Sequence, residues 1–239
     1  TDFKEKNNSI TFSIDYEDQI NEKISVEIGL KTNLKSFSTD YNYLQQLYNN
    51  KYDEDIYAAY TSFTYDITDR FGIKAGARFE KVETKASLDS SPENDLNPDS
   101  SNIISAIINN AVGESPYINP YSKVYPSVFL IYKLSSMQTI QLGYSKKVNR
   151  PGRRTISPFP RNTFDISRIR NGNPYLNPEY ADVAEMKFSS NARKLNVNAG
   201  ISYKLVKDNI MWWDRDMFEY EGKVYEIMTA DNSENSENI

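Results

Sequence analysis

The sequence lacks cysteine and histidine entirely, and none of its apolar runs is long. The first absence excludes thiolate nucleophiles, disulfides, zinc sites built from cysteine and histidine, and histidine-based catalytic triads. The second excludes a transmembrane helix, which needs roughly 18 or more consecutive apolar residues. The net charge of −5 also argues against a nucleic acid partner.

Signals of catalysis are missing as well. Asp53, Glu54 and Asp55 are contiguous, so in a strand their carboxylates point to alternate faces. No motif brings together a nucleophile, a base and an oxyanion hole, and the sequence has no glycine-rich phosphate loop. The sequence therefore predicts a protein that is not an enzyme, with no catalytic residues, no cofactor and no metal site.

Tyrosine and phenylalanine are abundant, with 18 and 11 copies against only 2 Trp. In 9–16, Ile10, Phe12, Ile14 and Tyr16 alternate with polar residues, a period of two that is typical of strands. Clear alternation of this kind predicts strands at 9–16, 23–31, 72–80 and 194–204. Weaker alternation predicts further strands near 54–67, 124–134, 138–147, 181–189 and 223–230.

The connections between these strands alternate in length. The short ones fall near 17–22, 67–71, 135–138 and 190–193. The long ones fall near 37–52, 86–122, 148–179 and 209–222. This alternation predicts an all-β fold, an antiparallel transmembrane β-barrel segment with short periplasmic turns and long extracellular loops. The apolar faces then meet lipid and the polar faces line a wet lumen, although a soluble sandwich also has strands with one polar face.

The predicted strands number about nine, whereas bacterial single-chain barrels have an even number. The polar run 232–239 is expected to be a turn rather than a terminal strand. We therefore expect residues 1–239 to form a partial β-barrel domain, with the remaining barrel strands outside it. The other interpretation is that the strand count is off by one.

The most specific stretch is 144–180, a strand end followed by a loop that prolines punctuate. Because proline fixes φ and removes a backbone donor, this loop cannot continue as a long hairpin, and on those grounds alone it is a structured surface loop. It carries a spaced set of residues, namely Tyr144, Ser145, Asn149, Arg150, Pro151, Gly172, Asn173, Pro174, Leu176, Pro178, Glu179 and Tyr180.

This set resembles the barrel of TonB-dependent outer-membrane receptors, in the Bacteroidota-type outer membrane protein beta-barrel family. The stretch 52–80 also resembles that barrel, and a weaker match lies at 22–31. The residues that carry the second match are Glu54, Ile56, Ala58, Ala59, Tyr60, Gly76, Arg78 and Glu80. The similarity covers a middle part of the barrel.

The resemblance implies uptake of a scarce nutrient, of the siderophore, glycan or peptide class, across the outer membrane. It implies outer-membrane lipid, a plug domain and TonB as partners, and a surface lipoprotein as a further one. Neither a plug nor a TonB-contacting segment is recognisable in these residues. The alternatives are a non-energised porin or assembly barrel, and a soluble β-sheet binding domain.

Two sets of charged residues are candidates for binding. Guanidinium groups in the loop 148–179 attract an anionic ligand or lipopolysaccharide, or else pair with acids such as Asp53, Glu54 and Asp55. These arginines are Arg150, Arg153, Arg154, Arg161, Arg168 and Arg170. Strand alternation assigns a second set to the lumen, where the plug would lie: Lys74, Arg78, Glu80, Glu185 and Lys187.

The loop 86–122 is rich in oxygen ligands, but their spacing does not match an EF-hand, which favours a solvated loop over a calcium site. They are Asp89, Glu93, Asn94, Asp95, Asp99 and Asn102. The apolar stretch 103–112 inside this loop is expected to form a short helix over the barrel mouth or a small local core.

Overall fold

The computed structural model describes residues 3–43, 46–90, 113–158, 161–162, 167–192, 195–220 and 222–238. Its long strands are β1 (Phe3–Asn21), β2 (Ile24–Tyr43), β3 (Gln46–Asp66), β4 (Phe71–Ser90), β6 (Tyr121–Ser135), β7 (Gln138–Asn149), β10 (Glu179–Ala192), β11 (Leu195–Tyr220) and β12 (Lys223–Asn238). The short elements are β5 (Tyr117–Ile118), α2 (Arg153–Ile156), β8 (Arg161–Asn162) and β9 (Arg168–Asn171).

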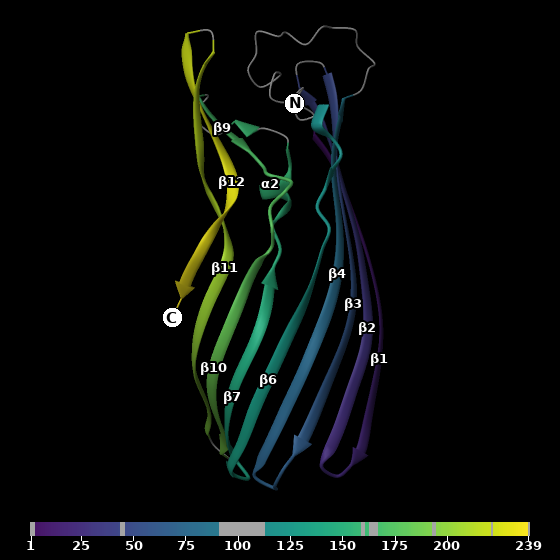
Figure 1. Cartoon of the computed structure of the whole chain (residues 1–239), viewed down its shortest axis with the longest axis vertical. Coiled ribbons are helices and arrows are strands. Elements are labelled where there is room, and N and C mark those ends of the chain that lie inside the picture. Colours follow the sequence, from purple (N-terminus) through teal and green to yellow (C-terminus); the bar gives the residue numbers. More distant parts are fainter. Residues whose placement is uncertain are drawn as a thin grey trace.

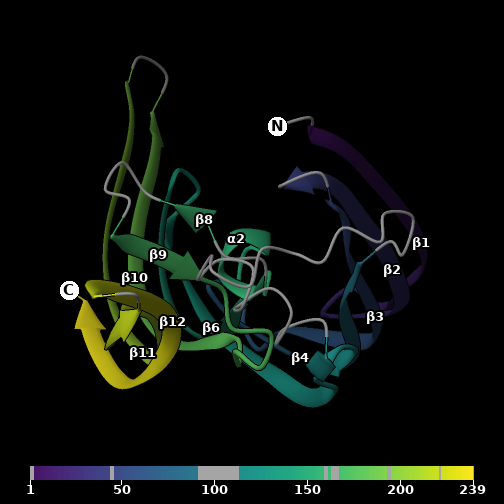
Figure 2. The ribbon, with the colours of Figure 1, turned by 90° about the horizontal axis from the view of Figure 1, so that it is seen from above.

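The long strands form one curved antiparallel wall (Figures 1 and 2). The sheet order is β1-β2-β3-β4-β6-β7-β10-β11-β12-β9-β8, with β5 paired to β4. All nine strands predicted from alternation are present, each as part of a longer strand. On the far side of β12, β9 pairs with it in parallel, from Arg168–Asn171 to Glu226–Thr229.

Short turns gather at one end of the wall, as predicted, and their sequences explain them (Figure 1). Between β1 and β2, the Asn21 side chain accepts a hydrogen bond from the backbone N–H of Lys23 at 2.9 Å. Between β3 and β4, the hydroxyl of Thr68 accepts the backbone N–H of Phe71 at 3.0 Å. Such side-chain caps let the chain reverse within a few residues.

Two of the four predicted long loops are wrong. Most of 37–52 belongs to β2 and β3, and most of 209–222 belongs to β11. The polar run 232–239, expected to be a turn, continues β12 to Asn238, which pairs with Lys204 of β11. These strand ends extend beyond the apolar part of the wall, so water can meet both faces. The backbone still pairs there, but no alternation of apolar residues marks it in the sequence.

The other two predicted long loops begin later and end earlier than expected, because the flanking strands are longer than predicted. Asp89 lies in β4, and Asn149 still belongs to β7. The remaining oxygen ligands predicted in this loop, and the predicted helix at 103–112, lie outside the described residues. Of the later part of the loop, residues from 113 on are described.

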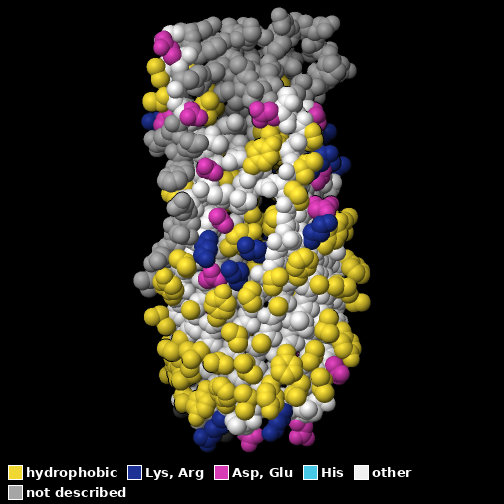
Figure 3. Space-filling model, in the orientation of Figure 1, with side chains coloured by type: hydrophobic (Ala, Val, Ile, Leu, Met, Phe, Trp, Pro, Cys, Tyr) yellow, Lys and Arg dark blue, Asp and Glu magenta, His cyan; other side chains and the backbone are white. Residues whose placement is uncertain are grey.

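One face of the wall is a continuous apolar band. The strand registers align apolar residues across four strands, as in Ile14 opposite Leu30, Leu30 opposite Ala59, and Ala59 opposite Phe79. On β1 the band runs from Ile10 to Tyr16, about 20 Å at the usual rise per residue, close to the outward apolar belt of outer-membrane barrels. The large side chains of this face are exposed, and they form the hydrophobic zone of Figure 3.

The opposite, concave face is polar and becomes packed only near the end with the long connections. There the segment after β7 folds inward, and α2 lies within the curve of the sheet when viewed from above (Figure 2). Ile156 of α2 packs with Leu176 and Ala230, and Tyr52, Ile210 and Trp212 lie against this cluster. The loop is therefore a folded part of the barrel mouth.

Candidate functional site in the barrel mouth

Arg150 anchors the infolded segment to the inner wall. Its Nε donates a hydrogen bond to the hydroxyl of Tyr121 at 3.0 Å, and its terminal guanidinium nitrogen pairs with Glu80. Glu80 is only 4% exposed and also accepts Nε of Arg78 at 2.6 Å. Arg150 was predicted to reach for a ligand from an extracellular loop, and the structure instead places it in this internal ion pair.

Gly172 lets two parts of the segment touch. Its backbone N–H donates to the carbonyl of Ser157 at 3.0 Å, and the N–H of Asn173 donates to Thr155 at 2.7 Å. A Cβ at Gly172 would collide with the backbone oxygen of Ser157. Glycine, which has no Cβ, allows two backbone segments to approach this closely. This explains why a glycine stands at position 172 in the motif.

Leu176 completes the same fold by burying its side chain in the mouth cluster. Its carbonyl accepts the amide of Asn119 at 3.2 Å, which ties the segment to the chain before β6. Beside it, the rings of Tyr117 and Tyr175 meet edge to face at 5.5 Å. Burial raises the pKa of Tyr117 to about 12, and the nearby carboxylate of Glu114 acts in the same direction.

The remaining arginines of this segment do not form one patch. Arg153 pairs with Glu5 at 2.5 Å, and its guanidinium lies 3.7 Å from the ring centroid of Phe37. Arg168 pairs with Glu226 at 3.0 Å on the far side of the mouth.

Arg170 lies over the ring of Trp212 at 5.7 Å. Arg154 is exposed, and the side chain of Arg161 lies outside the described residues. The structure therefore brings Arg153 and Arg154 together and separates both from Arg168.

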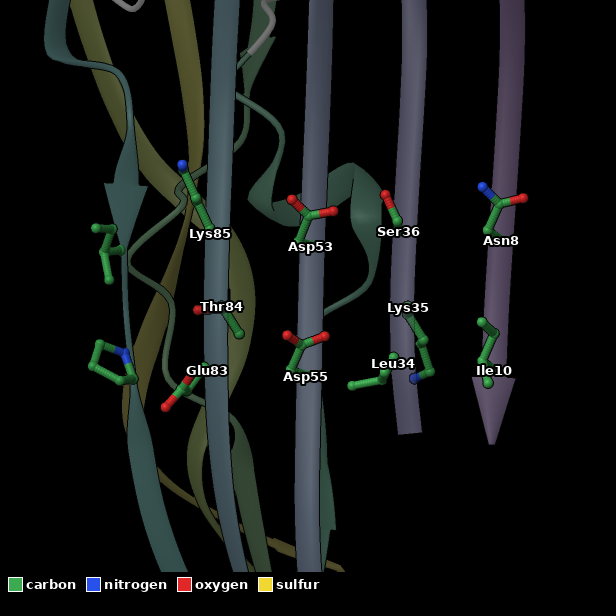
Figure 4. A pocket seen from close by; sticks show the side chains of 12 residues that line it. Asn8, Ile10, Leu34, Lys35, Ser36, Asp53, Asp55, Glu83, Thr84 and Lys85 are labelled. Atoms are coloured by element: carbon green, nitrogen blue, oxygen red, sulfur yellow. The ribbon is translucent and has the colours of Figure 1, made fainter. Parts of the chain in front are cut away.

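The acids expected to pair with these arginines have other partners. Glu54 pairs with Lys35 at 2.8 Å and Asp53 with Lys51 at 2.9 Å. The contiguous carboxylates do alternate in direction, because Glu54 is buried on the inner face while Asp53 and Asp55 line an outer hollow (Figure 4). Three of the arginines do form ion pairs with acids, but with Glu80, Glu5 and Glu226 rather than with Asp53, Glu54 or Asp55.

That outer hollow encloses about 640 Å³ across β1–β4, just above the apolar band. Asp53, Asp55 and Glu83 contribute carboxylates to it, with Lys85 beside them (Figure 4). In the part of the chain that the structure describes, no group of three or more acids is arranged to hold a metal ion.

A cavity of about 290 Å³ lies between α2 and the inner wall. Arg153 and Arg154 line one side, and Asn50 donates to the hydroxyl of Ser157 at 2.6 Å on another. Thr39 also lines it, and its buried hydroxyl has no hydrogen-bond partner in the described chain. Sequence reasoning missed Thr39, Asn50 and Ser157, because no local motif links residues that come from β2, β3 and a distant loop.

The five residues assigned to the lumen share the inner face. Glu80 and Arg78 belong to the ion pairs at the mouth, and Lys187 pairs with Glu185 at 2.8 Å. Lys74 is exposed on the same face. The strand registers place it in one row across the sheet with Glu185, through Phe129 of β6 and Gly143 of β7.

A scan against protein families matches residues 1–239 to the outer membrane protein beta-barrel family. The chain belongs to this family. It is therefore an outer-membrane β-barrel protein, as the sequence predicted. The Bacteroidota-type branch stays a prediction. No helix among the described residues is long and apolar enough to cross a membrane. No curated protein matches the sequence.

Solved structures of outer-membrane receptors share the fold of this family member. The alcaligin outer-membrane receptor FauA from Bordetella pertussis is 12% identical with a TM-score of 0.57, and the match covers 98% of this chain and 35% of the receptor. The ferric yersiniabactin uptake receptor FyuA from Yersinia pestis is 14% identical with a TM-score of 0.56, covering 88% and 30%. The hemophore receptor HasR from Serratia marcescens is 9% identical with a TM-score of 0.53, covering 98% and 45%. The chain thus spans less than half the length of each.

Proposed function

We propose that this chain is part of a TonB-dependent outer-membrane receptor that takes up a scarce nutrient of the siderophore, glycan or peptide class. The observation that carries the proposal is the pairing of a continuous apolar outer band with a charged inner face whose mouth is packed by an infolded segment. The first feature suits a wall in lipid, and the second suits a lumen that holds more protein rather than open water. The similarity in fold to uptake receptors supports the same conclusion.

Strand length favours a receptor over a porin. About 9–11 residues of strand suffice to cross the hydrocarbon layer, whereas β11 has 26 residues and β3 has 21. About half of β3 and more than half of β11 therefore stand beyond the lipid, where they can support a ligand-binding mouth. The exposed apolar face is also unsuited to a soluble sheet, because soluble proteins rarely leave a continuous apolar patch of this extent uncovered.

In this proposal the rest of the protein supplies a plug domain and further strands that close the barrel. Lys74, Glu185 and Lys187 would contact the plug, while Arg78 and Glu80 act mainly through Arg150. The mouth captures the ligand, and TonB drives rearrangement of the plug. Outer-membrane lipid surrounds the apolar band, and a surface lipoprotein would sit over the mouth.

The experiment is an uptake assay in cells that carry the complete receptor. Candidate nutrients are supplied one at a time to strains with and without TonB, and the receptor deletion strain sets the baseline. We expect uptake that requires both the receptor and TonB. Uptake that persists without TonB would contradict the proposal and favour a non-energised barrel. Heat-modifiable migration on a detergent gel confirms that the receptor is folded in both strains.

A further inference from the structure

The cavity in the barrel mouth carries more positive than negative charge. It is lined on one side by the guanidinium groups of Arg153 and Arg154, and among the described residues Glu5 is its one lining carboxylate. The strand residues that line it belong to the inner face, so it opens toward the lumen and away from lipid.

The two guanidinium groups are held differently. Arg153 is fixed by Glu5 at 2.5 Å and by the ring of Phe37 beneath it. Arg154 is exposed and has no acidic partner among the described residues. A guanidinium presents several N–H donors in a plane that matches carboxylate and phosphate oxygens. Arg153 therefore contributes a preorganised positive charge, and Arg154 contributes donors that are still available.

The wall of the cavity supplies a second, independent sign of a ligand. Thr39 is 0% exposed, and its hydroxyl makes no hydrogen bond within the described chain. Buried polar groups in proteins are nearly always hydrogen-bonded, so a buried hydroxyl that lines a cavity calls for an acceptor from outside the chain. The bond from Asn50 to Ser157 fixes the neighbouring part of the wall.

We propose that this cavity is an oxyanion subsite of the receptor, which takes a carboxylate or phosphate group of the transported molecule. Arg154 and Arg153 bind its charge, and the hydroxyl of Thr39 donates a hydrogen bond to one of its oxygens. The cavity lies at the small end of ligand pockets, which typically measure about 300–1,000 Å³, so it holds one anionic arm of a larger molecule. This inference rests on the proposed uptake function, because the mouth is where cargo would arrive.

The test is calorimetric titration of the complete, detergent-solubilised receptor with citrate and, separately, with inorganic phosphate. We expect Arg154→Gln to raise the dissociation constant by roughly tenfold, because charge-assisted hydrogen bonds are lost. Arg154→Lys, which keeps the charge but loses the planar fork, should lie between that variant and the unmodified receptor. Thr39→Val, which removes only the hydroxyl, should raise the constant by about threefold. Arg70→Gln, in the short turn at the opposite end, is the matched control and should bind as the unmodified receptor does.

Each outcome of the titration supports or overturns the proposed subsite. Tighter Arg154-dependent binding of citrate supports a carboxylate arm, and tighter Arg154-dependent binding of phosphate supports a phosphate arm. Absence of heat with both anions, or binding that Arg154→Gln and Thr39→Val leave unchanged, overturns the subsite. The titration needs no TonB, so a TonB-independent uptake result would overturn the proposed function without deciding the titration. Conversely, a titration that overturns the subsite would leave the proposed TonB-dependent uptake standing.

Discussion

Arg150 and Glu80 are 70 residues apart in the chain and form an ion pair inside the barrel mouth. The pair joins the segment after β7 to the inner face of β4, and Arg78 binds the same carboxylate from its own strand. Glu80 is thus held between two guanidinium groups. The infolding of the segment depends on this contact together with the burial of Ile156 and Leu176.

The first prediction follows from this ion pair. Arg150→Ala leaves the buried carboxylate of Glu80 with one partner, and we expect a loss of roughly 2–4 kcal/mol in the free energy of unfolding. Urea unfolding of the complete receptor in detergent measures it. Lys81→Ala, which removes the solvent-exposed pair with Glu83, is the control and should cost much less. Equal losses in the two variants would mean that the internal pair has no special role.

Glycine at position 172 gives the second prediction. Gly172→Ala adds a methyl group against the backbone of Ser157, and we expect a cost of about 1–3 kcal/mol together with faster proteolysis of the segment. Gly152→Ala is a matched control two residues after Arg150, because a Cβ at Gly152 meets nothing within 4 Å. If limited proteolysis cuts both variants equally fast, the close approach at Gly172 is not what holds the segment.

The third prediction separates the two faces of β7. Leu142→Arg places a charge in the apolar band, and we expect a cost of about 2–4 kcal/mol for a site near the bilayer midplane. Gln141→Arg, one residue earlier, places the same charge on the inner face and should be tolerated. The fraction of receptor that shows heat-modifiable migration from isolated outer membranes measures both. Similar assembly of the two variants would contradict the assignment of faces.

A fourth prediction concerns the lumen. Lys74 is exposed on the inner face and has no acidic partner among the described residues, so it is free to meet a plug. Lys74→Glu should loosen plug seating, seen as increased entry of a small antibiotic through the complete receptor. Lys133→Glu, at the end of β6 near the short turns, serves as the charge-matched control. Unchanged entry in the Lys74 variant would remove this residue from the plug interface.

The strands in the apolar band were predictable because lipid and lumen impose opposite polarity on successive residues. Ile10 to Tyr16 on β1 and Ile140 to Tyr144 on β7 show this alternation directly. The extensions of β2 and β11 were not predictable in this way. Both faces of these strand ends lie beyond the apolar band, so neither face requires apolar residues. Hydrogen bonding between backbones continues there without a signature in side-chain type.

The mouth was the least predictable part. Sequence identified Arg150 and Gly172 as members of a spaced set, but not their partners Glu80 and Ser157. The arginines were grouped because they are close in sequence, whereas the folded segment turns Arg150 inward, Arg153 toward β1 and Arg168 toward β12. The cavity depends on Thr39 and Asn50, and only tertiary structure brings these residues beside α2.

The most direct test of the account is cysteine scanning along β7, which the chain favours because it has no cysteine of its own. Single substitutions at positions 139–145 are made in a complete receptor free of other cysteines and are labelled in intact outer membranes with a water-soluble maleimide. The account predicts labelling with a period of two, in which I140C, L142C and Y144C are protected by lipid while T139C and Q141C react from the lumen side. Uniform labelling, or protection of the opposite set, would contradict a wall with its apolar face in the membrane.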